Sequence, residues 1–214
     1  KPPLLRPRLF RLGEDDHVFF LTMHHILADG WSLGLLLQEL REFYESEMEG
    51  REPVLPELEI QYPDFAEWEL ETLRGETLDS LQKYWKQSLT PLPSSLELPH
   101  ASGGKATDFA GAHHYERLPA SDVQGLRLLV QEEESTLFMG FLTLLKLLLY
   151  RSSGQSDLAV GTLAAGREQP ELERLIGFFS NTLVRRTKLD PEGSFRENRR
   201  LVRTTTLGGF THQA

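Results

Sequence analysis

Apolar and polar positions alternate along the chain in a way that predicts both strands and helices. The segment His17–Met23, HVFFLTM, is almost continuously apolar and rich in β-branched and aromatic residues, which is typical of a strand covered on both faces. Leucines and aromatic residues then recur at helical spacing over residues 33–48, with Ser32 as the expected N-cap. The opening unit is therefore predicted to be a strand, a short loop and a helix.

The rest of the chain continues this mixed pattern. Helices are expected at residues 62–73, 76–89, 121–134, 136–150 and 194–212. Strands are expected at residues 112–118, 157–162 and 179–189. The order strand, helix, strand in the second half favours a crossover unit with parallel pairing, so the pattern predicts an α/β protein.

One stretch lacks this periodicity and favours a domain boundary. Between residues 90 and 111 the composition shifts to Pro, Ser, Gly and Ala, as in a linker. We therefore expect an N-terminal part comprising residues 1–104 and a C-terminal part comprising residues 105–214.

Composition excludes several classes of function. With 214 residues, 39% of them hydrophobic, the chain can bury a substantial core. A formal net charge of −9 argues against nucleic acid as a partner, because phosphate contacts need clustered Lys and Arg. The most apolar stretch, residues 136–150, is too short to cross a bilayer comfortably and contains Lys146, so we expect no membrane insertion. Cysteine is absent and no secretory leader opens the chain, which favours the cytoplasm.

The loop after the first predicted strand carries the candidate chemistry. His24 and His25 are adjacent, and Asp29 and Gly30 follow a few positions later. An imidazole exchanges protons near neutral pH and suits general-base work, while the aspartate can orient it or pair with an arginine, and the glycine permits a tight turn.

Two other interpretations of this loop stay open. Neighbouring residues of a strand point to opposite faces, so one histidine can face a site while the other packs, or both can be ordinary satisfied polar groups. A metal site is disfavoured, because no helix carries a His-Glu-x-x-His pattern and there is no cysteine.

Three motifs in the expected order resemble one family. HHILADG, residues 24–30, matches the H-H-x-x-x-D-G signature of nonribosomal peptide synthetase condensation domains, a signature that chloramphenicol acetyltransferase and epimerization domains share. YPDFAEW, residues 62–68, and IGFFSNTL, residues 176–183, resemble the family's Y-x-D-F-A-x-W and I-G-x-F-x-N-T-L motifs. VGTLAAGR, residues 160–167, resembles the strand and loop that precede the last of these.

The resemblance implies a fold and an activity. The fold is α/β with two chloramphenicol acetyltransferase-like lobes, here incomplete at both ends because the family's opening and closing motifs do not occur in this sequence. The activity is formation of an amide between an upstream carrier-bound acyl or peptidyl thioester and a downstream aminoacyl amine. Such domains serve the biosynthesis of secondary metabolites, including antibiotics.

The resemblance also implies roles for individual residues. His25 is expected to be catalytic. Asp29 is expected to be structural and to pair with Arg167, while Gly30 keeps space beside the histidine. The other implied site residues, which shape the active site and its channel, are His24, Trp31, Ser32 and Asn181. No metal is implied.

Partners follow from the same resemblance. No cofactor is expected to bind directly, since both substrates are carried on the phosphopantetheine arms of upstream and downstream peptidyl carrier proteins, in an assembly line that also contains adenylation domains. The alternatives are an epimerization domain, an ester-forming relative and a non-catalytic carrier-docking fragment. Heterocyclising relatives are disfavoured, because a D-x-x-x-x-D motif replaces their histidine pair.

Overall fold

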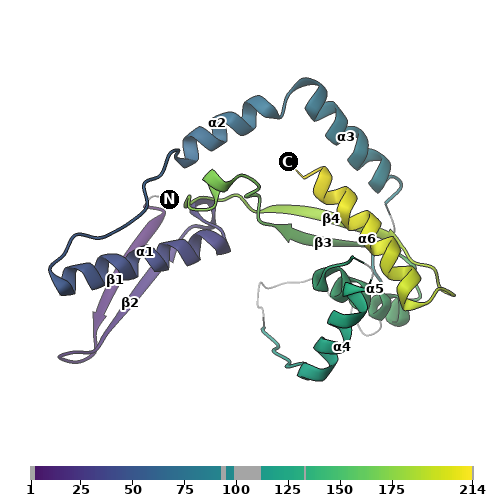
Figure 1. Cartoon of the computed structure of the whole chain (residues 1–214), viewed down its shortest axis with the longest axis horizontal. Coiled ribbons are helices and arrows are strands. Elements are labelled where there is room, and N and C mark those ends of the chain that lie inside the picture. Colours follow the sequence, from purple (N-terminus) through teal and green to yellow (C-terminus); the bar gives the residue numbers. More distant parts are fainter. Residues whose placement is uncertain (1–2, 93–94, 99–111, 133, 214) are drawn as a thin grey trace. The chain divides into compact units, whose positions relative to one another are not determined.

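The computed structural model describes residues 3–92, 95–98, 112–132 and 134–213 (Figure 1). Its helices and strands are, in chain order, β1 (Leu5–Arg11), β2 (His17–Met23), η1 (His25–Leu27), α1 (Gly30–Glu49), α2 (Tyr62–Thr72), α3 (Gly75–Leu89), α4 (Ala120–Gln131), α5 (Leu137–Ser153), β3 (Asp157–Ala164), η2 (Pro170–Leu172), β4 (Asn181–Lys188) and α6 (Phe195–Thr211). None of the helices in these ranges has both the length and the apolar character needed to cross a membrane.

The described residues form two compact units. The first unit lies within residues 1–80 and 163–182, and the second within residues 81–162 and 183–213. The division predicted between residues 104 and 105 lies outside the described residues and stays a prediction.

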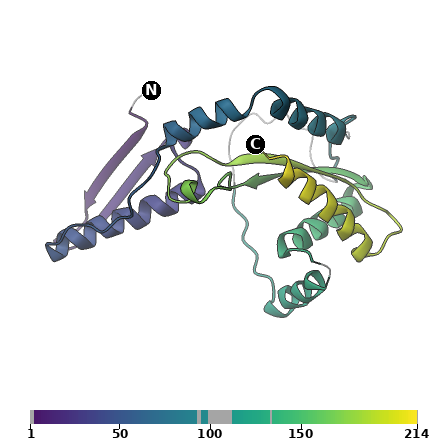
Figure 2. The same cartoon turned by 45° about the horizontal axis from the view of Figure 1, so that its top comes forward.

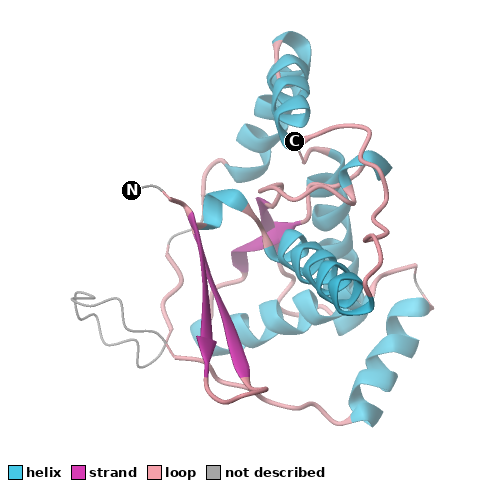
Figure 3. Cartoon of the chain, turned by 90° about the vertical axis from the view of Figure 1, so that its left-hand side faces the viewer, coloured by secondary structure: helices cyan, strands magenta, loops and turns pink. Residues whose placement is uncertain are grey.

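A two-stranded antiparallel hairpin opens the first unit (Figure 3). The strand predicted at His17–Met23 is confirmed as β2. The prediction that both of its faces are covered is wrong for the described residues, since Phe19 and Phe20 are about half exposed. Its neighbour β1 was not predicted, because Pro7 and alternating arginines interrupt the apolar pattern there. A proline is tolerated in a strand at the edge of a sheet, which is where β1 lies.

The core of the first unit joins α2 to the segment between β3 and β4. Phe65 of α2 packs with Leu172, Leu175 and Phe179, all buried. Helix α2 begins with a capping box, in which the side chain of Gln61 and the carboxylate of Asp64 bond reciprocally to backbone N–H groups. The segment 172–180 is thereby held against a helix more than a hundred residues away in sequence.

In the second unit, helices gather around β3 and β4 (Figure 2). The Leu189 N–H donates to the carbonyl of Ser156, and the Thr162 hydroxyl donates to the carbonyl of Leu183. The partner of each residue moves backward as the chain moves forward, so β3 and β4 are antiparallel. The buried core of this unit comprises Leu142, Leu158, Leu189 and Val202.

The strand expected at residues 112–118 is wrong, and with it the parallel crossover. Residues 112–119 have no regular secondary structure, and Tyr115 is 85% exposed. This segment, AHHYERL, offers too few apolar side chains to bury one face of a strand, so local alternation alone did not establish a sheet position.

Candidate active site

The histidine pair lies just beyond the end of β2. The strand ends at Met23, His24 is the N-cap of the 3₁₀ turn η1, and His25 is its first residue. The alternation of strand faces, expected to separate the two histidines, therefore does not apply. They differ in another way, because Nδ1 of His24 accepts a hydrogen bond of 3.2 Å from the Ile26 N–H.

The environment of His25 is more open. Its imidazole is exposed, and none of the residues that the structure describes hydrogen-bonds to it. Its ring contact is with Phe178, at 5.4 Å between centroids and 78° between planes. The nitrogens are thus available to an incoming group.

Asp29, and not Ser32 as predicted, is the N-cap of α1. The helix begins at Gly30, and Oδ1 of Asp29 accepts a 2.8 Å hydrogen bond from the Ser32 N–H. A carboxylate suits this position, because the N-terminal backbone N–H groups and the helix dipole favour negative charge.

The same carboxylate holds the loop that follows η2. Its Oδ2 accepts hydrogen bonds from the Phe179 N–H at 3.1 Å and from the Ser180 hydroxyl at 3.2 Å. Oδ1 lies 3.4 Å from Nη2 of Arg167, and both side chains are only 1% exposed. Burial alone would raise the pKa of Asp29, but the hydrogen bonds from Ser32 and Phe179 and the charge of Arg167 outweigh it and lower that pKa below its usual value.

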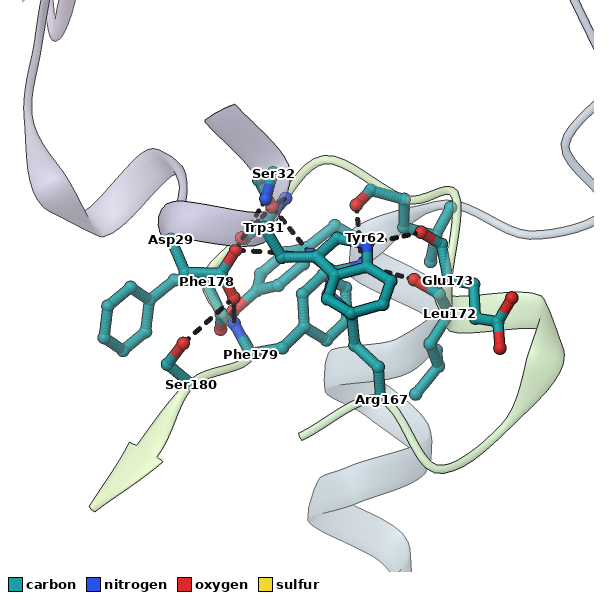
Figure 4. Close-up of polar contacts among 12 residues, drawn as sticks. Asp29, Trp31, Ser32, Tyr62, Arg167, Leu172, Glu173, Phe178, Phe179 and Ser180 are labelled. Carbon is teal, nitrogen blue, oxygen red and sulfur yellow. Dashed lines mark hydrogen bonds and ion pairs between the residues drawn. The ribbon is translucent and has the colours of Figure 1, made fainter. Parts of the chain in front are cut away.

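Arg167 binds several groups of this loop at once (Figure 4). Its Nη1 donates to the carbonyls of Leu172 and Leu175, and its guanidinium stacks 4.0 Å from the centroid of Phe179. Burial lowers the pKa of Arg167, whereas the charge of Asp29 raises it. The guanidinium remains protonated, because arginine is not deprotonated in proteins. Asp29 and Arg167 together therefore fasten the loop to the start of α1.

Ser32 completes this fastening. Its side chain is fully buried, and its hydroxyl donates to the Gly177 carbonyl at 2.7 Å while accepting from the Gly177 N–H at 3.0 Å. The same oxygen accepts from Nη2 of Arg167 at 2.6 Å. We call Asp29, Ser32 and Arg167, with the loop segment 177–180, the loop clasp.

Three further residues were predicted for the site, namely Gly30, Trp31 and Asn181. Trp31 is half exposed and donates from Nε1 to the Glu173 carbonyl at 2.9 Å. A Cβ at Gly30 would meet no atom within 4 Å, and its backbone is not left-handed, so the expectation that a bulkier residue would strain the turn there is wrong. Asn181 is the exposed first residue of β4.

Two glycines that the sequence analysis did not single out are required by the clasp. Gly166 has φ of 66°, and a Cβ there would collide with the Phe179 carbonyl. A Cβ at Gly177 would collide with the ring of Tyr62. Both glycines lie inside quoted motifs, so the signal was present, but only the fold shows which atoms approach them.

The described part of the chain brings together no group of three or more His, Cys, Asp or Glu side chains that could hold a metal ion.

The chain is similar in sequence to a known family and to characterised proteins. The family model for the condensation domain matches residues 1–214. One of the proteins that make up linear gramicidin synthase in Brevibacillus parabrevis is 43% identical over 217 residues, which cover 99% of this chain and 3% of that protein.

Solved structures share the fold. The X-domain in its complex with OxyB from teicoplanin biosynthesis matches with a TM-score of 0.87 at 27% identity, covering 98% of this chain and 47% of that one. The first condensation domain of the CDA synthetase matches with a TM-score of 0.78 at 22% identity, covering 99% of this chain and 47% of that one. The chain spans less than half the length of each of these proteins.

These matches confirm the predicted α/β class with a chloramphenicol acetyltransferase-like fold. The chain belongs to the condensation domain family.

Proposed function

We propose that this chain contributes the reacting histidine of a nonribosomal peptide synthetase condensation domain, which forms amide bonds. The α-amine of a downstream aminoacyl thioester attacks the carbonyl carbon of an upstream acyl or peptidyl thioester. A C–N bond forms, the C–S bond breaks, and the proton released by the amine ends on the departing thiol. The product is one unit longer and remains on the downstream carrier.

His25 is the group proposed to position the amine and accept its proton. The observation that carries this assignment is the contrast within the histidine pair, since His24 uses Nδ1 to cap η1 while the exposed His25 ring has no hydrogen bond from the described residues. A general base must have a free nitrogen within reach of the proton it removes.

The other site residues have supporting roles in this proposal. Asp29 and Arg167 brace the loop and take no part in proton transfer, because both side chains are buried and already paired. Gly30 is proposed to keep space beside the histidine. His24, Trp31, Ser32 and Asn181 shape the surroundings of the site.

Both substrates are proposed to arrive as thioesters on the phosphopantetheine arms of two peptidyl carrier proteins. The acceptor and donor building blocks would be loaded by adenylation domains of the same assembly line. This chemistry requires no directly bound cofactor, and we place it in the cytoplasm.

The test is substitution of His25 in a complete condensation domain that contains this chain. We expect His25→Ala to reduce formation of the dipeptidyl product at least 100-fold, the scale of a lost general base. His17→Ala is the matched control, because His17 is an exposed histidine at the start of β2, outside the site, and it should retain most of the activity. Unchanged product formation by a folded His25→Ala domain would overturn the proposal.

A second candidate, docking without catalysis, is favoured by one observation. The X-domain that shares this fold was solved as a complex with OxyB. A wild-type domain that binds loaded carriers yet forms no product would favour this candidate. The same assay distinguishes the related chemistries, since a hydroxyl acceptor reports ester formation and exchange of the α-proton with deuterium reports epimerization.

A further inference from the structure

The side chain of His25 has one ring contact that can fix its orientation. Its ring has no hydrogen bond from the described residues, so backbone attachment in η1 and the contact with Phe178 define where it points. The two rings meet nearly at right angles, with centroids 5.4 Å apart, which is a favourable arrangement for aromatic groups.

Phe178 is itself held firmly by its backbone. Its carbonyl accepts a hydrogen bond of 2.9 Å from the Tyr62 hydroxyl, whose ring packs in the core of the first unit. The residue before it, Gly177, exchanges two hydrogen bonds with the Ser32 hydroxyl, and the residue after it, Phe179, donates to Asp29. Every peptide around Phe178 is therefore anchored, as Figure 4 shows for Tyr62, Ser32 and Asp29.

Packing does not account for the aromatic ring of Phe178. Phe178 is 39% exposed and lies outside the buried cluster, whereas its neighbour Phe179 is 6% exposed and belongs to that cluster. The FF pair is thus divided, with one ring buried beside Arg167 and the other against His25. In the motif I-G-x-F-x-N-T-L, Phe178 occupies the unspecified position.

We infer that Phe178 is a positioning residue, which transmits the rigidity of the loop clasp to the imidazole of His25 through their ring contact. This inference rests on the proposed function of His25. The clasp fixes the Phe178 backbone, the Phe178 ring limits rotation of the imidazole, and a ring nitrogen is thereby held ready for the amine. Holding a catalytic group in its reactive orientation raises the rate of the chemical step, whereas binding of the substrate is little affected.

The test compares three variants in the complete condensation domain. We expect Phe178→Leu to lower kcat about 3- to 10-fold with KM unchanged, the range that corresponds to loss of one aromatic contact. Phe178→Tyr keeps the ring and should restore kcat. Phe43→Leu is the matched control, since Phe43 is a half-exposed aromatic residue of α1 outside the clasp, and it should leave kcat unchanged.

A spectroscopic measurement supports the kinetic one. In protein labelled at the histidine ring carbons, the His25 signal should shift in Phe178→Leu, because the ring current of the phenylalanine is lost, and should stay near its place in Phe178→Tyr. The inference is overturned if Phe178→Leu leaves either kcat or the His25 signal unchanged, if Phe178→Tyr loses as much kcat as Phe178→Leu, or if only KM changes. Thermal melting checks that each variant is folded.

Failure of the proposed function would look different. In that case His25→Ala would retain product formation, although the His25 signal could still respond to Phe178→Leu. By contrast, if the domain is active and Phe178→Leu shifts the His25 signal without changing kcat, the positioning role is overturned while the proposed function and the ring contact stand.

Discussion

Arg167 in the first unit and Lys146 in the second are both buried, yet within the part of the chain that the structure describes only Arg167 has a carboxylate at its head group. Arg167 meets Asp29, and each of the two side chains is 1% exposed. Lys146 is 0% exposed, and its Nζ donates to two neutral acceptors, the carbonyl of Arg185 and the hydroxyl of Thr187, both at 2.7 Å.

The two environments have opposite consequences for charge. At Arg167 the ion pair stays charged, because each partner compensates the other. At Lys146 burial is the main effect and lowers the pKa to about 7, which repulsion by Arg185 reinforces and attraction by Asp157 opposes. A buried cation with a counter-ion can fasten a loop at any ordinary pH, whereas one without a counter-ion makes stability depend on pH.

The largest expected effect comes from breaking the pair. Asp29→Asn should lower the free energy of unfolding by about 3–5 kcal/mol, because it leaves Arg167 charged and unpaired in the interior. The new amide would also direct N–H groups toward donors on one side of the residue, either Ser32 and Arg167 or Phe179 and Ser180. Urea unfolding of the condensation domain measures the loss, and a loss below about 1 kcal/mol would contradict the assignment of Asp29 as the centre of the clasp.

An intermediate effect is expected at Lys146, and it depends on pH. The unfolded chain binds a proton at this lysine up to pH 10.5, whereas the folded chain loses it near pH 7. Between these values the unfolded state holds more protons, so stability rises with pH. The rise from pH 7 to pH 9 should be about 2 kcal/mol larger in the wild type than in Lys146→Met, because methionine cannot titrate.

Urea unfolding of both proteins at pH 7, 8 and 9 measures this difference directly, since the contribution of every other group cancels between them. Parallel curves for the wild type and Lys146→Met would show that the lysine is not deprotonated in the folded state.

The smallest effect is expected for an ion pair that is only partly buried. Arg186 bonds both oxygens of Asp157, at 3.0 and 2.7 Å, but the side chains are 19% and 28% exposed. Water and salt screen such a pair, so Asp157→Asn should lower the free energy of unfolding by about 0.2–1 kcal/mol, less at high salt. Because the chemical change equals that of Asp29→Asn, the ratio of the two losses measures how much burial matters. Equal losses would contradict the contrast between the two sites.

Local patterns predicted most elements because each element depends on spacing within a short window. The apolar run at His17–Met23 and the helical spacing after Ser32 correspond to β2 and α1. The predictions failed where residues distant in sequence determine whether a strand forms. β1 contains a proline that an edge strand tolerates, and residues 112–118 alternate without finding a sheet to join.

The site divides in the same way. The motif pattern was enough to name His25, Asp29 and Arg167 through a family resemblance. It was not enough to identify Ser32 as a buried junction or Phe178 as the ring that contacts His25, because these roles depend on hydrogen bonds and ring contacts across more than a hundred residues.

The sequence by itself determined the α-helices, the strands β2, β3 and β4 and the identity of the chemical groups, since periodicity and residue type are local properties. Only the tertiary structure decided how these groups are used. Asp29 and Arg167 are separated by 138 positions, and folding places the carboxylate where it caps α1, pairs with the arginine and anchors the loop at once. Hydrogen bonds act over about 3 Å, so which histidine caps η1 and which aromatic ring contacts His25 follow from packing and not from spacing along the chain.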